Sequence, residues 1–332
     1  MTLQEIYELA IKMGINADPR GEDQVIKILK KNKKEYEELS SEKKKYFDQE
    51  SLINPYADSR ILYGNPKLNI KKVISGIDVE SGEIALVDML NQKFNPSTSK
   101  TSEGQGKIDL IIGHHPEGCA LAGLDEVMDI QVDLLSNYGV PINVAESLLK
   151  DRVSQVKRGL NPTNHQRSVD AAKLLDIPFM VIHTICDNLG HNFLSQKLEQ
   201  KNWDTVGEVL EEILKIPEFR ESKTKKAGPR ITVGSEKNRA GKVAITGFTG
   251  GTEGSRLIYE KMSQAGIGTI VEMHMSEDHF KEAKGQHLNV IVSGHMASDS
   301  LGVNLFLDEL EKKGIEVIPF SGLIRYKRGG IK

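Results

Sequence analysis

The chain has 332 residues, a formal net charge of -3 and 38% hydrophobic side chains. This length favours two hydrophobic cores. The nearly balanced charge argues against nucleic acid as the main partner. No apolar run approaches the roughly 18 residues that span a bilayer, and the glutamates of the first fourteen residues are atypical of a signal peptide. Only two cysteines are present, which suits a reducing compartment. We expect a soluble cytoplasmic protein with no membrane partner.

Residues 1–60 predict a helical, charged N-terminal extension. Between residues 22 and 48, lysines and glutamates alternate and apolar positions are sparse after Leu29. Such a pattern is typical of helices that face water.

Residues 61–216 predict a first α/β domain. Short apolar runs indicate strands, and longer periodic runs indicate helices. The expected elements are a strand at 70–79, a helix or second strand at 81–92, a polar loop at 93–107, a strand at 108–113, helices over 120–176 with a break at 159–166, a strand at 177–187 and helices over 191–216.

Residues 217–240 predict a linker, because they begin with a basic stretch that carries proline at both ends. Residues 241–332 then predict a second α/β domain in which apolar strands alternate with amphipathic helices. This alternation is typical of βαβ units. The fold class is therefore α/β, with two α/β layers and largely parallel or mixed sheets.

Polar side chains collect where the predicted strands end. They are His114 and His115, His183 and Asp187, Glu272 and His274, and His295 and Asp299. Ligands of open α/β sheets bind beyond the carboxyl ends of the strands. Each position alone is a weak signal, because a histidine at a strand end is more often a structural residue. Together, imidazoles and carboxylates without thiolates suit zinc, iron or manganese.

A glycine-rich turn, GFTGGTEGS at 247–255, lies between a predicted strand and a predicted helix. Its amides, around Gly250 and Gly251, could bind an anion at the helix N-terminus. A tight βα turn also recruits glycine without any ligand, and the sequence matches neither phosphate-binding motif in full.

Taken in order, these motifs resemble the Nif-three-like family (NGG-one interacting factor three). The landmarks are HHP at 114–116, HTICD at 183–187, FTGG at 248–251 and GHMASD at 294–299. The earlier ADSRILYG also resembles a family segment at Asp58 and Gly64. The resemblance extends from about Ala57 to the end of the chain.

The resemblance implies a site for two divalent metal ions, with ligands His114, His115, Asp187, His295 and Asp299. His183 would then serve the substrate or support the ligands, and Glu272 and His274 match a looser family segment. Asp299 stands where the family has glutamate, which shortens the side chain by one methylene. The resemblance also implies a homohexameric ring.

Such a site predicts a metal-dependent hydrolase of the cyclohydrolase or phosphoesterase type, acting on a nucleotide or small phosphorylated molecule. Glu117 or His183 could shuttle the proton. One alternative is a metal-binding ring that acts as a scaffold or interaction module with little turnover. A second is a mononuclear hydrolase that does not depend on Asp299. The motifs alone do not identify the metal or the substrate.

Overall fold

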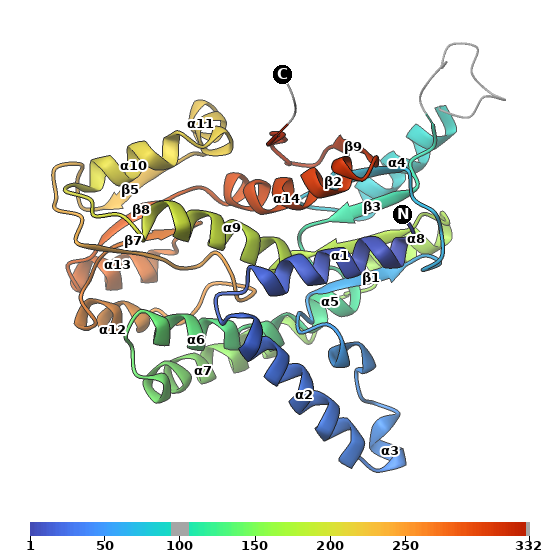
Figure 1. Ribbon diagram of the computed structural model, residues 1–332, viewed down its shortest axis with the longest axis horizontal. Coiled ribbons are helices and arrows are strands. Elements are labelled where there is room, and N and C mark those ends of the chain that lie inside the picture. The colour runs from blue at the N-terminus through green and yellow to red at the C-terminus, as the bar shows by residue number, and fades with distance from the viewer. Residues whose placement is uncertain (94–105, 330–332) are drawn as a thin grey trace.

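The computed structural model describes residues 1–93 and 106–329 and contains two mixed β-sheets (Figure 1). Most of the predicted polar loop at 93–107 lies outside the described residues. The five-stranded sheet has the order β1(Ser59–Tyr63), β4(Phe179–Ile182), β3(Leu110–Gly113), β2(Lys72–Gly76), β9(Glu316–Pro319). The four-stranded sheet has the order β5(Arg230–Val233), β8(Asn289–Val292), β7(Ile267–Glu272), β6(Lys242–Ile245).

Each sheet is parallel except at one edge. β1 runs antiparallel to β4, and β5 runs antiparallel to β8. The three central strands of the first sheet, β2, β3 and β4, are buried at every residue, as expected for parallel strands with helices on both faces. The predicted α/β class with mixed sheets is confirmed.

Helices cover both faces of the first sheet. One face packs against α1(Leu3–Asn16) and the end of α14(His295–Lys312), and the other packs against α4(Ser81–Lys93) and α8(Arg167–Leu174). The segment 81–92, for which the sequence allowed a helix or a strand, thus forms the helix α4.

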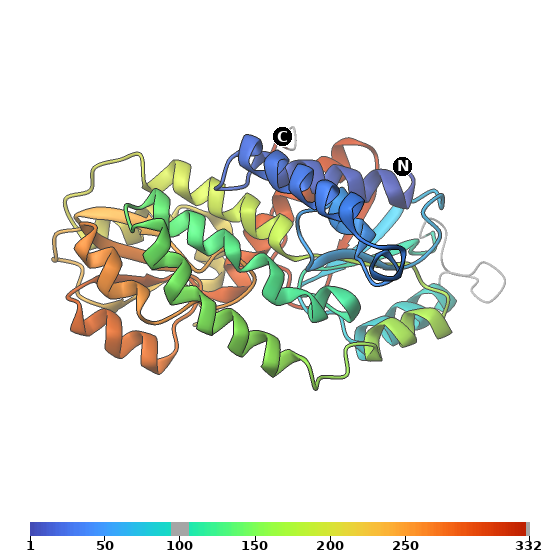
Figure 2. The same ribbon diagram turned by 90° about the horizontal axis from the view of Figure 1, so that it is seen from below.

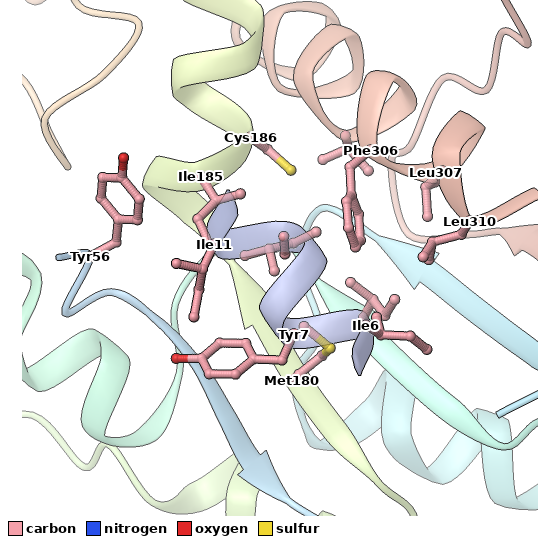
Figure 3. Packing of buried hydrophobic residues seen from close by; sticks show 14 of the residues in the cluster. Ile6, Tyr7, Ile11, Tyr56, Met180, Ile185, Cys186, Phe306, Leu307 and Leu310 are labelled. Atoms are coloured by element: carbon pink, nitrogen blue, oxygen red, sulfur yellow. The ribbon is translucent and has the colours of Figure 1, made fainter. Parts of the chain in front are cut away.

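The helix α1 belongs to this core, although its residues fall in the predicted N-terminal extension. A capping box between Thr2 and Glu5 starts the helix. Its buried face includes Ile6, Tyr7 and Ile11, and Figure 3 shows these side chains directed at Met180, Ile185 and Phe306. The 3.6-residue spacing of these apolar side chains explains the burial.

The remainder of the N-terminal segment is helical and mostly exposed. It forms α2(Glu22–Glu38), α3(Ser41–Lys44) and the short 3-10 helix η1(Gln49–Leu52). Val25 is the one buried residue of α2. In Figure 1, α2 and α3 extend away from the sheets.

The second sheet also lies between two helical layers (Figure 1), one of which is in front in the view from below (Figure 2). One layer contains α10(Val206–Leu214) and α11(Pro217–Thr224), and the other contains α6(Asp129–Asn137), α7(Ile142–Leu160), α12(Ile258–Gln264) and α13(Glu277–Gly285). The short elements α5(Gly118–Ala122) and η2(Leu124–Val127) precede α6.

Two segments differ from the expected order of elements. Residues 217–240, expected as a linker, include α11 and β5, and β5 pairs with β8. The C-terminal strand β9 returns to pair with β2 of the first sheet. The expected division into 61–216 and 241–332 remains a prediction about folding units, but each sheet draws a strand from outside its expected segment.

The helices α9(His183–Leu198) and α14 lie side by side between the two sheets (Figure 1). They approach closely at Gly302, where a Cβ atom would lie 2.0 Å from the carbonyl oxygen of Cys186. Gly302 therefore permits the crossing, which brings together the first turns of both helices. No helix within residues 1–93 and 106–329 is long and apolar enough to cross a membrane.

Candidate metal centre

The paired histidines emerge where β3 ends. Their backbone amides donate to the end of β2 and the residue after it: His114 N to the carbonyl oxygen of Gly76 at 3.0 Å and His115 N to that of Ile77 at 3.0 Å. Neighbouring side chains of a regular strand point to opposite faces. Because β3 ends at Gly113, both imidazoles turn to the same carboxylate, that of Asp299.

Two helix N-termini supply the other predicted ligands. The strand β4 ends at Ile182, and His183 begins α9, whereas the sequence placed His183 and Asp187 at the end of a longer strand. His183 and Asp187 are one helical turn apart and face each other at 3.7 Å between Nε2 and Oδ2. The same spacing on α14 sets His295 Nε2 3.4 Å from Asp299 Oδ2.

The described residues contain three groups of side chains that could hold a metal ion, with ligand atoms within 4.8 Å of one another in each group. They are His114, Asp187 and Asp299; His115, His295 and Asp299; and His114, His115 and His183. All five predicted ligands and His183 are thus brought together.

Asp299 lies at the centre of the cluster and is 1% exposed. Its Oδ1 atom is 3.6 Å from His114 Nε2, and its Oδ2 atom is 3.5 Å from His115 Nε2. The two oxygens therefore face different metal-binding groups.

Several buried polar atoms of the cluster have no hydrogen-bond partner. They are His114 Nε2, Asp187 Oδ1 and both carboxylate oxygens of Asp299. Leaving such atoms unpaired costs about 1–3 kcal/mol each, and more for charged groups. A cation among them would satisfy all four atoms, and nitrogen with carboxylate oxygen is a donor set that zinc, iron and manganese accept. The residues present therefore fit a metal ion.

The pKa shifts within the cluster also indicate that its carboxylates need positive charge nearby. Burial favours the neutral form of Asp299, but the nearby His114, His115 and His295 outweigh it and hold its pKa well below the usual range. Burial likewise disfavours protonated His115, but Asp299 and Asp78 raise its pKa to about 9. The carboxylates thus attract protons onto His114 and His115 when no metal ion is bound, whereas burial lowers the pKa of His295.

Two further carboxylates orient the histidines, and the sequence analysis did not assign them this role. The Nδ1 atom of His183 lies 2.9 Å from Asp58, which also accepts a hydrogen bond from the Thr184 hydroxyl at 2.6 Å. The Nδ1 atom of His115 lies 2.6 Å from Asp78. Such pairs leave Nε2 of each ring free for a ligand. Of these two carboxylates, only Asp58 has a signal in the sequence, because it stands in a segment that resembles the family.

Other predicted residues lie outside the three groups. Glu117 is the N-cap of α5, where burial raises its pKa. His274 is adjacent to the cluster, since its ring centroid lies 4.9 Å from that of His295. Glu272 contacts Tyr259 instead.

The glycine-rich turn packs against protein. A Cβ atom at Gly250 would lie 2.6 Å from Gln131 Cγ, and one at Gly251 would lie 2.9 Å from Val127 Cγ2. Gln131 Nε2 also donates to the carbonyl oxygen of Gly250 at 2.7 Å. These glycines permit close packing of the turn, and their proposed contact with an anion remains untested.

Comparison with solved structures shows the fold. The chain is similar to a NIF3 superfamily protein from Sphaerobacter thermophilus, with 22% identity, a TM-score of 0.75 and coverage of 97% of this chain and 99% of that chain. A weaker likeness is to reduced HcgD from Methanocaldococcus jannaschii, with 17% identity, a TM-score of 0.48 and coverage of 84% and 94%. No protein-family model matches the sequence, and neither does any curated protein.

The chain therefore has the fold of a NIF3 superfamily protein over nearly its whole length, as the sequence motifs predicted. At this identity the likeness concerns the fold, so the chemistry has to be argued from the site itself.

Proposed function

We propose that this protein is a metal-dependent hydrolase with a dinuclear centre held by His114, His115, Asp187, His295 and Asp299. The observation that carries the proposal is the convergence of four buried ligand atoms without hydrogen-bond partners from α9, α14 and the end of β3. A fold that only needed stability would give these atoms hydrogen bonds or replace them with apolar groups.

The position of Asp299 supports two ions. Of the three groups, one contains His114 and Asp187, a second contains His115 and His295, and Asp299 belongs to both. Because its two oxygens face different groups, Asp299 could be a ligand to both ions of a pair. The side chain is shorter than the glutamate expected here, yet it reaches the histidines of both groups.

When bound, a metal pair supplies Lewis acidity and lowers the pKa of a water molecule toward neutrality. The chain itself orients the proton acceptor. Asp58 accepts a hydrogen bond from Nδ1 of His183, and this tautomer of the neutral ring presents Nε2 as a proton acceptor directed toward Asp187. We assign His183 the role of proton shuttle, while Glu117 is a weaker candidate because it lies outside the three groups.

For the substrate we propose a nucleotide or another small phosphorylated molecule, as the resemblance implies. The test is hydrolysis of a panel of nucleotides and phosphate esters by protein loaded with zinc, manganese or iron(II). Asp299→Asn should abolish metal-dependent hydrolysis. His183→Ala should retain bound metal and lose roughly 10²–10⁴-fold in kcat.

His287, which lies in the turn after α13 and outside the three groups, offers a matched control, because His287→Ala should leave both metal content and rate unchanged. Full metal loading without hydrolysis of any member of the panel would contradict the hydrolase and favour the metal-binding scaffold. The ring-shaped hexamer and the cytoplasmic location remain predictions.

A further inference from the structure

A second buried polar cluster lies beside the metal centre, on the second sheet. Glu272 is the last residue of β7 and is 6% exposed. Its carboxyl oxygens lie 3.2 and 3.1 Å from the hydroxyl of Tyr259 on α12, and no cation pairs with it within the described residues 1–93 and 106–329. Burial raises the pKa of Glu272 to about 8, so the carboxyl group carries a proton at neutral pH.

The hydrogen bonds continue outward from Tyr259. Its hydroxyl lies 3.0 Å from Nδ1 of His279 on α13, and Nε2 of that ring lies 3.6 Å from an Oε2 atom of Glu253. The last separation exceeds a direct hydrogen bond. Glu253 is partly exposed, and a small rotation of its side chain or one water molecule closes this gap.

The two ends of this series differ in exposure, because Glu272 is buried whereas Glu253 is partly exposed. A narrow cavity of about 30 Å3 runs beside the whole series: Glu272, Tyr259, His279 and Glu253 all line it, together with Thr246 and His274. Such a volume accommodates about two water molecules. The Thr246 hydroxyl is buried without a partner, which suits a water molecule there. An outer groove between α7 and α13 is lined by Arg152, Glu253, Ser276 and His279.

We propose that Glu272, Tyr259, His279 and Glu253 form a proton relay between the buried end of β7 beside the metal centre and the outer groove. His274 lines the same cavity as Glu272, and its ring contacts that of the predicted ligand His295. The use of the relay during turnover rests on the proposed hydrolase function. The relay itself does not depend on that function.

The transfer balances in protons and charge. The Glu272 carboxyl proton passes to the Tyr259 oxygen while the Tyr259 proton passes to His279 Nδ1. The resulting imidazolium then releases its Nε2 proton to the Glu253 carboxylate. One proton has moved from Glu272 to Glu253, and His279 is neutral again in its other tautomer.

Both intermediate groups suit a relay. Burial lowers the pKa of His279, so its imidazolium form is short-lived at neutral pH. Burial and Glu272 raise the pKa of Tyr259, so its hydroxyl keeps a hydrogen to pass on. The ionisable groups acting on this pair are Glu253, Arg152, His274, Asp278 and Glu272.

The test uses the metal-free full-length protein and no substrate, so it can fail independently of the hydrolase proposal. A rapid pH jump across the pKa of Glu272 is followed by time-resolved infrared absorption of the buried carboxyl group, which Glu272→Gln assigns by loss of the band. Tyr259→Phe removes the hydroxyl and keeps the ring. Deprotonation of Glu272 should slow by roughly 10²-fold, within the range of positioned proton transfer.

Tyr63→Phe is the matched control, because Tyr63 donates to Asp176 on the surface at 2.8 Å, and its infrared kinetics should equal those of the wild type. Equal rates in Tyr259→Phe and the wild type would overturn the relay and show that water reaches Glu272 directly. Absence of a Glu272 carboxyl band at neutral pH would overturn it as well, because the inner proton donor would be missing.

Discussion

The Nδ1 atom of His183 lies 2.9 Å from Asp58, a residue 125 positions earlier in the chain that is fully buried. This contact joins the entry to β1 with the first turn of α9. It fixes the His183 ring so that Nε2 faces Asp187 at the metal centre. Carboxylate–histidine pairs of this kind orient and strengthen ligands in metal sites.

Asp58→Asn should therefore slow the proposed hydrolysis while preserving the fold and the metal content. The amide keeps the shape of the side chain but removes the charge that selects the His183 tautomer. We expect a loss of roughly 10²-fold in kcat, measured beside metal content per chain. Asp176→Asn, which alters an exposed tyrosine partner, should keep the wild-type rate, and an Asp58→Asn protein with an unchanged rate would refute this role.

Gly302→Ala should disturb the crossing of α9 and α14. The new Cβ atom would lie 2.0 Å from the carbonyl oxygen of Cys186, next to Asp187. Relief requires the helices to separate, at a cost of about 1–3 kcal/mol or more in the free energy of unfolding, and metal affinity should fall with it. Denaturant unfolding and metal titration measure the two effects.

Gly190 offers the matched control for this substitution. It is also helical and lies at the same crossing, but its Cβ atom would meet no atom nearer than 3.6 Å. Gly190→Ala should change stability by much less than Gly302→Ala does. Equal effects of the two substitutions would show that close approach at Gly302 is not what positions the ligands.

The burial of Glu272 predicts a pH dependence of stability. Its pKa is raised from 4.5 to about 8 in the folded chain by burial. The folded state therefore binds more protons than the unfolded state between these values, and the free energy of unfolding decreases as pH rises through this range. At about 1.4 kcal/mol per pH unit, the upper limit of the loss is several kcal/mol.

Glu272→Gln should flatten this dependence, because a neutral amide does not titrate. Urea unfolding at a series of pH values measures it. The partly exposed Glu260, which pairs with Lys261, supplies the control: Glu260→Gln should retain the wild-type slope, because a surface ion pair contributes little to stability. A wild-type slope in Glu272→Gln would show that Glu272 is already ionised in the folded protein.

The candidate ligands do not share one sheet edge, because His114 and His115 follow β3 of the first sheet whereas His295 and Asp299 follow β8 of the second. They were predictable from the sequence as motifs at strand ends that resemble those of a family. The HHP motif and the four-residue spacing of His295 and Asp299 carried that signal. The supporting contacts were not predictable. Asp58 meets His183 across 125 residues and Asp78 meets His115 across 37, and no local pattern encodes a pairing between distant segments.

Parts of the fold also depended on tertiary contacts. The basic composition of 217–230 is typical of a linker, yet β5 forms because β8 offers an unpaired edge. Likewise β9 has an apolar pattern that fits either sheet, and its return to β2 follows from the direction of α14. The helix α1 was assigned to the charged N-terminal extension because the residues that follow it are rich in charge. The spacing of the apolar side chains within α1, taken by itself, predicts an amphipathic helix.

The central claim is that the five ligands hold a pair of metal ions, and the most direct test is metal content per chain. Protein purified without chelator would be measured by elemental analysis beside His114→Ala, Asp299→Ala and the control His287→Ala. We predict close to two metal ions per chain in the wild type and the control, and a marked loss in both ligand variants. A wild-type protein that binds no metal ion, even after incubation with zinc, manganese or iron(II), would contradict the account.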